Sequence, residues 1–177
     1  MIKSKKLITF IIVLLGVFFL TNNFFNKEPE DLILEKKVMI KTIKKLKKEK
    51  NLFCIGFGGF GKEKIKISSL SFTHGEPCNI DKARELLVYA IELFLNEFNS
   101  FKKIHPYLEN YPFTNKNVEV RIFFENKKRN TISSYISVVS LTRGKIFYKI
   151  DENNSLITVY EEPYERALNF IKRKNHS

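Results

Sequence analysis

The chain contains no tryptophan, two cysteines and three histidines among its 177 residues. With so few thiols and imidazoles, and with neither a CxxC pair nor a Cys/His spacing, the sequence excludes the usual zinc sites. No spacing of nucleophile, base and orienting group is recognisable either, so we expect no cofactor and no metal. Intrinsic disorder is excluded too, because 44% of the residues are hydrophobic and 17 are Phe.

The two cysteines, Cys54 and Cys78, leave one covalent question open. An oxidising compartment outside the cytoplasm would allow them to form a disulfide. Two free thiols are the alternative, because a disulfide requires Cα atoms within about 7 Å of each other.

The net charge of +12 is spread over the whole chain. Residues 51–177 carry 19 Lys and Arg against 14 Asp and Glu, with the signs mixed. A nucleic-acid-binding domain gathers its positive charge into one patch or helix face. We therefore expect nucleic acid not to be a partner.

The first 26 residues have the layout of a membrane-targeting segment. Lys3, Lys5 and Lys6 precede an apolar run from Leu7 to Leu20, and counting on through Thr21-Asn22-Asn23 to Phe25 gives a segment of 19 residues. Nineteen residues are just enough to span a bilayer as a helix, and no small-residue cleavage site follows. We predict a signal anchor over residues 1–26 and a single-pass membrane protein whose domain faces away from the cytoplasm. The alternative is a cleaved signal peptide and secretion.

Residues 27–50 are predicted to form a lysine-rich helical connector, with nine Lys against five acidic residues. One interpretation is a solvated helix that separates the domain from the membrane. The other is a basic helix face, within residues 36–50, that contacts anionic lipid. The lysines expected to make those contacts are Lys37, Lys41, Lys44, Lys45 and Lys48.

Residues 51–177 are predicted to form one α+β domain. Strands are expected over 51–61, 64–72 with a bulge at Ser68–Ser69, 118–124, 134–141, 145–150 and 156–160. Apolar residues at helical spacing predict a long helix over 80–101, capped by Asn79 or Asp81, and a short helix after Pro163. The expected architecture is an antiparallel sheet of about five to six strands, covered on one face by the long and the short helix, after an N-terminal membrane helix.

Gly56, Gly58 and Gly61 match the dinucleotide pattern G-x-G-x-x-G in form only. The pattern requires a helix after the glycines, whereas residues 62–67 favour a strand. The alternatives are core packing of the two phenylalanines or an exposed partner surface. The second interpretation combines the Gly-Phe repeat with the aromatic loop after the long helix, and it involves Phe57, Phe60, Tyr107, Tyr111 and Phe113.

Three stretches together resemble a family of small, uncharacterised bacterial proteins that are exported or membrane-anchored. They are Gly56–Gly59 with Leu70–Phe72, then Ala83–Val88, then Pro106–Leu108 with Pro112–Thr114 and Asn117–Val120. The resemblance covers roughly residues 55–170. It implies a setting in the bacterial envelope, and it assigns no catalytic residue.

These observations favour a non-enzymatic, membrane-tethered or exported domain with a binding or structural role and a protein partner. A small hydrolase that uses Cys78, His74 or His105 is the alternative, because His74 and Cys78 lie close together in sequence. A lipid-surface binder acting through residues 36–50 is a further alternative.

Overall fold

The computed structural model describes residues 28–125 and 135–174, which form six strands, three α-helices and one 3₁₀ helix. The predicted signal anchor lies outside the described residues. Within them, no helix is both long and apolar enough to cross a bilayer. The strands are β1 (Phe53–Phe60), β2 (Ile67–His74), β3 (Val118–Phe124), β4 (Val138–Thr142), β5 (Lys145–Glu152) and β6 (Ser155–Pro163).

The six strands form a single sheet in chain order, β1-β2-β3-β4-β5-β6. Four of the five pairings are antiparallel, but β2 and β3 run parallel. The expectation of an all-antiparallel sheet is wrong at this point. A helix separates β2 from β3, and a crossover of this kind returns the chain in the same direction.

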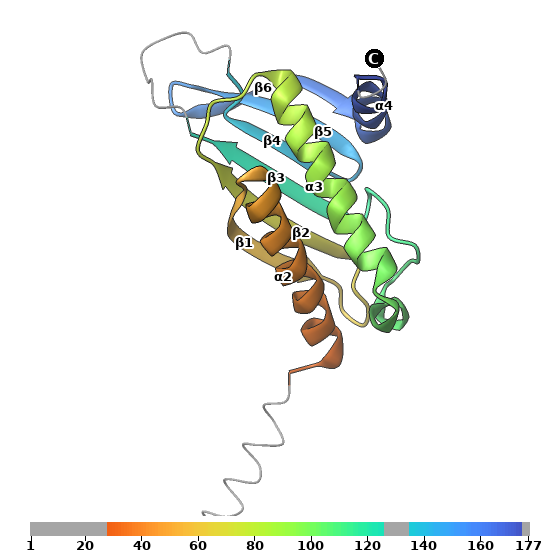
Figure 1. The fold of residues 1–177 in the computed structure, drawn as a ribbon. Helices are drawn as coiled ribbons and strands as arrows, with labels where there is room; N and C mark the ends of the chain where they lie inside the picture. Colours follow the sequence, from red (N-terminus) through yellow and green to blue (C-terminus); the bar gives the residue numbers. More distant parts are fainter. Residues whose placement is uncertain (1–27, 126–134, 175–177) are drawn as a thin grey trace, which may run out of the picture.

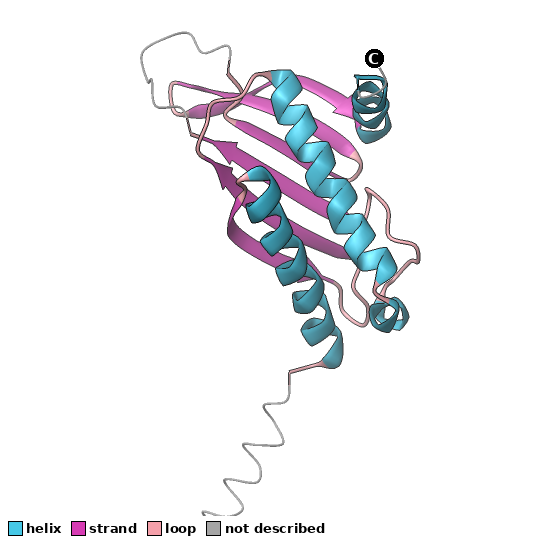
Figure 2. Ribbon diagram, viewed as in Figure 1, coloured by secondary structure: helices cyan, strands magenta, loops and turns pink. Residues whose placement is uncertain are grey.

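Helices α2 (Glu30–Lys50) and α3 (Ile80–Ser100) lie side by side across one face of the sheet (Figures 1 and 2). The expected long helix is α3, whose first turn is capped by Asn79: its Oδ1 accepts a hydrogen bond from the Lys82 amide at 2.9 Å. The short helix α4 (Tyr164–Lys174) follows β6 at the far edge of the sheet. Helix α2 therefore covers the face beside α3, and the short helix α4 packs against α3 with Tyr164 and Ala167 in the same core.

The prediction that residues 27–50 form a connector outside the domain is wrong for the helical part. Leu34, Val38, Met39 and Leu46 of α2 are buried in the same core cluster as the inner residues of α3 and the sheet. Burying a side chain of this size contributes roughly 1.5–3 kcal/mol. Helix α2 is thus an integral layer of the domain.

Side chains alternate along the strands, so one sheet face meets the helices and the other carries mostly small or polar residues. In β2 the buried residues are Ser68, Leu70, Phe72 and His74. The predicted bulge at Ser68–Ser69 is wrong, since β2 pairs regularly with β3 from Ser68 to His74. The irregularity lies instead in β1, between Cys54 and Gly56, and it leaves Ile55 as the extra residue.

Candidate functional site

Strand β1 is an edge of the sheet, and it is unusually exposed for a strand of that composition. It pairs with β2 on one side, and on the other side the described residues provide no neighbouring strand. Phe57 is 50% exposed and Phe60 69% exposed, and Phe53 and Ile55 are exposed as well. The sequence Phe53–Phe60 contains no charged residue and no proline. Natural proteins usually protect an edge with such residues, because free backbone groups recruit other strands.

The glycines of β1 differ in what surrounds them. A Cβ placed on Gly56 or Gly58 would meet nothing within 4 Å, so packing within the chain does not require glycine there. At Gly59 it would lie 2.5 Å from Oε2 and 2.7 Å from Cδ of Glu35, and closer still to Oε1. A side chain at residue 59 would therefore displace the carboxyl group of Glu35 in α2.

Glu35 is a carboxylic acid in the core, only 4% exposed. Its Oε1 and the buried Oγ of Ser68 have no hydrogen-bond partner among the described residues. Burial raises the pKa of Glu35, and the nearby negative charge of Asp31 adds to this shift. Glu35, Ser68 and Gly59 mark the contact between α2 and the edge of the sheet, and sequence reasoning missed all three.

The aromatic loop after α3 is only partly a surface. Tyr111 is exposed and stacks on His105 with ring centroids 4.0 Å apart, while the hydroxyl of Tyr107 donates to Glu30 at 2.9 Å. Phe113 is buried against Phe98 in the core. Its assignment to an interaction surface is wrong, because Asn99 holds the backbone of Phe113 and turns the ring inward.

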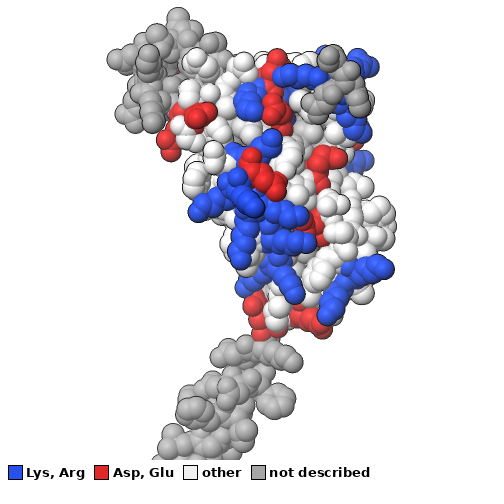
Figure 3. All heavy atoms as spheres, in the orientation of Figure 1, with Lys and Arg blue, Asp and Glu red and all other residues white. Residues whose placement is uncertain are grey.

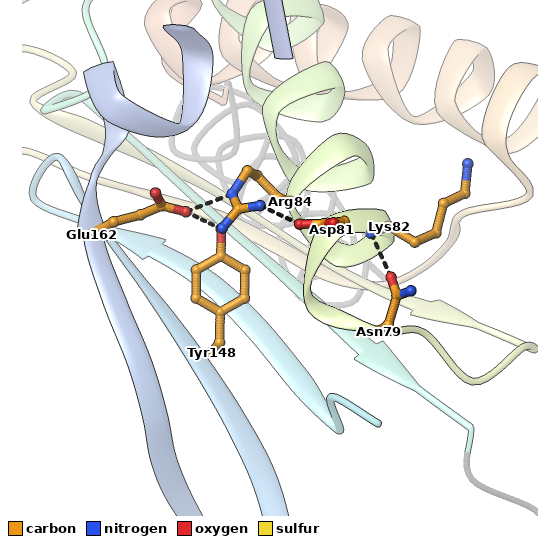
Figure 4. Close-up of polar contacts among 6 residues, drawn as sticks. All are labelled: Asn79, Asp81, Lys82, Arg84, Tyr148 and Glu162. Carbon is orange, nitrogen blue, oxygen red and sulfur yellow. Dashed lines mark hydrogen bonds and ion pairs between the residues drawn. The ribbon is translucent and has the colours of Figure 1, made fainter. Parts of the chain in front are cut away.

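A buried polar network joins α3 to the far half of the sheet (Figure 4). Arg84 is 6% exposed and Glu162 2% exposed, and Arg84 Nε donates to Glu162 Oε1 at 2.7 Å. The Tyr148 hydroxyl donates to the same oxygen at 2.6 Å, and Arg84 Nη1 donates to Asp81 at 2.6 Å. The Arg84 guanidinium also lies over the ring of Phe170 in α4.

This network is better explained by packing than by catalysis. Burial alone would lower the pKa of Arg84, but the hydrogen bond and the charge of Glu162 outweigh it and leave that pKa raised. Burial and the bond to Glu162 raise the pKa of Tyr148, which keeps the phenol neutral. Each of the three side chains has a partner, so the network fixes α3 and α4 against β5 and β6.

The residues of the hydrolase alternative contact backbone groups. His74 Nδ1 accepts from the Glu76 amide at 3.3 Å, and Cys78 Sγ donates to the Glu76 carbonyl at 3.8 Å. Burial raises the pKa of Cys78 to about 11, which disfavours the nucleophilic thiolate. His105 lies within 3.0 Å of the Asn99 carbonyl. None of these contacts joins one of the three side chains to another of them.

Cys54 and Cys78 are both free thiols, so the structure does not contain the disulfide considered above. Cys54 is half-buried in β1, where its thiol donates to the Gly56 carbonyl at 3.5 Å. Cys78 is buried just before α3.

The lysines of α2 divide into two sets. Lys41 and Lys45 bind the two carboxylate oxygens of Glu97, a buried residue of α3, at 2.7 and 2.6 Å. Burial alone would raise the pKa of Glu97, but these lysines outweigh it and lower that pKa. Lys44 and Lys48 are exposed and have no ion-pair partner among the described residues, whereas Lys37 lies over the ring of Phe101, 5.6 Å from its centroid. Figure 3 shows the positive charge gathered over α2.

Three surface hollows lie away from the buried polar network. The largest has about 440 Å³ and lies beside the loop that follows β1, between Phe60 and Glu109. Another, of about 290 Å³, separates α2 from the end of α3, next to Lys37 and Phe101. A third, of about 120 Å³, lies on the open sheet face around Arg121 and Ser140. In the described part of the chain, no three acidic, His or Cys side chains form a group able to hold a metal.

Comparison of the chain with protein-family models, curated proteins and solved structures found no match. Among the described residues, the exposed edge strand β1 is the most distinctive surface feature.

Proposed function

We propose that the chain is a non-enzymatic protein-binding module, and that it recognises an extended segment of a partner protein by adding it as a strand beside β1. The tether to the membrane is the predicted segment of residues 1–26. The observation that carries the proposal is the free edge of β1, eight residues long, with no charge or proline and with Phe53, Ile55, Phe57 and Phe60 exposed. In strand addition, main-chain hydrogen bonds supply affinity and side-chain contacts supply specificity.

The glycines without a packing role support this proposal. Gly56 and Gly58 have open space where a side chain would be, and each pairs with a serine of β2, Ser71 or Ser69. Glycine inside a strand weakens it and often marks a place where another backbone approaches closely. A partner segment at this edge would find small residues beside it, flanked by aromatic rings.

The charge on α2 favours a partner other than a second copy of the chain. Helix α2 contacts β1, and residues 30–50 carry eight lysines against four acidic residues. Pairing β1 of two copies would bring two such helices towards each other, and like charges would oppose the contact. An extended segment with acidic residues between apolar ones meets no such repulsion.

Site-specific cross-linking tests the proposal. A photoreactive phenylalanine analogue replaces Phe57 in the full-length chain, in the cells that produce it, and the matched control carries the analogue at the exposed Phe170 of α4. We expect one discrete protein adduct from position 57 and none from position 170. Adding Ile55→Lys should abolish that adduct, because a lysine at an edge opposes strand pairing.

Hydrogen exchange on the purified complex distinguishes strand addition from a side-chain contact alone. A paired edge protects its backbone amides, so exchange in residues 53–60 should slow when the partner is bound. Equal adducts at positions 57 and 170, an adduct unaffected by Ile55→Lys, or unchanged exchange in β1 would each refute the proposal.

A further inference from the structure

The outer face of α2 carries two isoleucines that the fold does not use. Ile33 is 46% exposed and Ile40 44% exposed, although the core stripe of this helix is complete without them. Seven residues separate them, so they lie nearly one above the other on the helix surface. Lys36, Lys37 and Lys44 are three or four residues from one of these isoleucines and share that face.

The contacts of the lysines show which of them are free to meet a ligand. Lys41 and Lys45 bind Glu97, so they serve the packing of α2 on α3. Lys36 forms an ion pair with Glu28, and Lys37 lies over the ring of Phe101. Lys44 and Lys48, one turn apart and exposed, have no ion-pair partner among the described residues. The basic patch seen in Figure 3 therefore contains positive charges that the domain itself does not neutralise.

From these observations we infer that the outer face of α2, with Ile33 and Ile40 beside the unpaired Lys44 and Lys48, binds the surface of an anionic membrane. Exposed apolar residues bordered by lysines fit the boundary between headgroups and acyl chains, where the apolar groups insert and the ammonium groups meet lipid phosphates. Lys41 and Lys45, included in the sequence-based set of lipid contacts, do not belong to this face.

Two features favour a membrane over a nucleic acid, the other large polyanion. Helix α2 contains no arginine, the residue whose guanidinium is best suited to bind phosphates through bidentate hydrogen bonds. Its patch is centred on isoleucines, which gain nothing from a phosphate backbone. The segment from Leu7 to Phe25 also ends only five residues before Glu30, where α2 begins. A bilayer that receives that segment would hold α2 close to its surface.

The absence of tryptophan makes a direct test available. Ile40→Trp creates a single-tryptophan chain, with Ile33→Trp as a second reporter should the first fold poorly. Leu156→Trp, exposed on the opposite edge strand β6, is the matched control. The full-length proteins are combined with vesicles whose acyl chains carry bromine, a quencher confined to the bilayer, made of phosphatidylcholine alone or equimolar with phosphatidylglycerol.

We expect the bilayer to quench the fluorescence of the Ile40→Trp protein only in the vesicles that contain phosphatidylglycerol, and high salt to abolish this quenching. The Leu156→Trp protein should be unquenched in both. The double substitution Lys44→Gln with Lys48→Gln should lower the ratio of the membrane-bound to the unbound state of the α2 face roughly 30-fold. The reason is that each lysine near an anionic surface contributes about 1 kcal/mol to the free energy of membrane binding. Lys149→Gln with Lys172→Gln removes the same charge from β5 and α4, and it should change nothing.

Four results would overturn the inference. The first is no quenching of either helix reporter, Ile40→Trp or Ile33→Trp, with phosphatidylglycerol, and the second is equal quenching in phosphatidylcholine alone. The third is equal quenching of the Leu156→Trp control, and the fourth is a response of the Ile40→Trp protein to RNA or DNA in place of lipid. The strand-addition proposal is tested by position 57 and stands or falls separately.

Discussion

Gly59→Ala tests the contact between α2 and β1 more directly than any other single substitution. The added methyl group would lie 2.5 Å from Oε2 of Glu35, well inside van der Waals distance, so the buried carboxyl must move. Inserting a methyl group into a packed core typically costs about 1–3 kcal/mol. Against this, alanine in a strand is about 0.5–1 kcal/mol more favourable than glycine. We expect a net loss of roughly 1–2 kcal/mol in the free energy of unfolding.

A double-mutant cycle assigns that loss to Glu35. In the background of Glu35→Ala the obstacle is gone, so Gly59→Ala should become neutral or stabilising, with a coupling of about 1–3 kcal/mol between the two sites. Gly58→Ala is the matched control. It changes the neighbouring residue of the same strand, where a Cβ meets nothing within 4 Å, so it should be neutral or slightly stabilising.

The assay is urea denaturation followed by circular dichroism, since the chain has no tryptophan to report unfolding by fluorescence. Equal effects of Gly59→Ala and Gly58→Ala would refute the reasoning. So would an effect of Gly59→Ala that persists undiminished beside Glu35→Ala.

Three further predictions concern the other buried groups. Arg84→Met should cost about 3–5 kcal/mol in urea denaturation because it leaves the buried Glu162 without its cationic partner, whereas replacing both residues by apolar ones should cost less. Since burial raises the pKa of Glu35 above 4.5, the unfolded chain loses that proton first. The free energy of unfolding should therefore fall, relative to Glu35→Gln, as pH rises from 4.5 through the folded-state pKa, and no such fall would contradict the assignment. Iodoacetamide at neutral pH should label Cys54 before Cys78, which is buried and whose pKa is raised to about 11. Equal labelling would contradict the structure.

The sequence predicts most of the secondary structure because its patterns are strong where packing demands them. The apolar stripe of α3 and the alternation in β3 leave little choice, and the number of strands in the sheet is confirmed. The parallel pairing of β2 and β3 was accessible too, since a long helix between two neighbouring strands favours a parallel crossover. The hairpin-linked strands before and after that helix favour antiparallel pairing, and they led to the prediction of an all-antiparallel sheet.

Helix α2 shows why composition can mislead. Its lysines suggested a solvated spacer, yet Leu34, Val38, Met39 and Leu46 lie on the stripe that meets the core. Spacing should have outweighed charge there. Ile33 and Ile40 are also recognisable in the sequence, because they are apolar, seven residues apart and outside that stripe.

The candidate site was harder to predict because its features depend on tertiary position. The sequence around each residue does not distinguish Phe57, which is exposed at an edge of the sheet, from Phe113, which is buried. Whether a strand is central or at an edge is decided by its neighbours in the sheet. The pairing of Gly59 with Glu35 joins residues from two elements, and the small size of a glycine reveals a close neighbour only when the fold is known.

The two proposed surfaces constrain each other through the contact between Glu35 and Gly59. Helix α2 packs on β1, and that contact fixes the outer face of the helix relative to the free edge of the strand. If the isoleucines of that face lie on a bilayer, the edge of β1 is held at a fixed distance from the lipid. A partner segment would then have to reach β1 along the membrane surface, which favours a protein that is itself attached to the same membrane.

Gly59→Ala, by displacing Glu35, should weaken the binding of the partner segment and the binding of lipid together. Ile55→Lys should weaken only the binding of the partner segment, and Lys44→Gln with Lys48→Gln only the binding of lipid. Because a simple loss of stability would also weaken both, the comparison requires Gly59→Ala samples that circular dichroism shows to be folded, and unaffected binding in those samples would show that the two surfaces act independently.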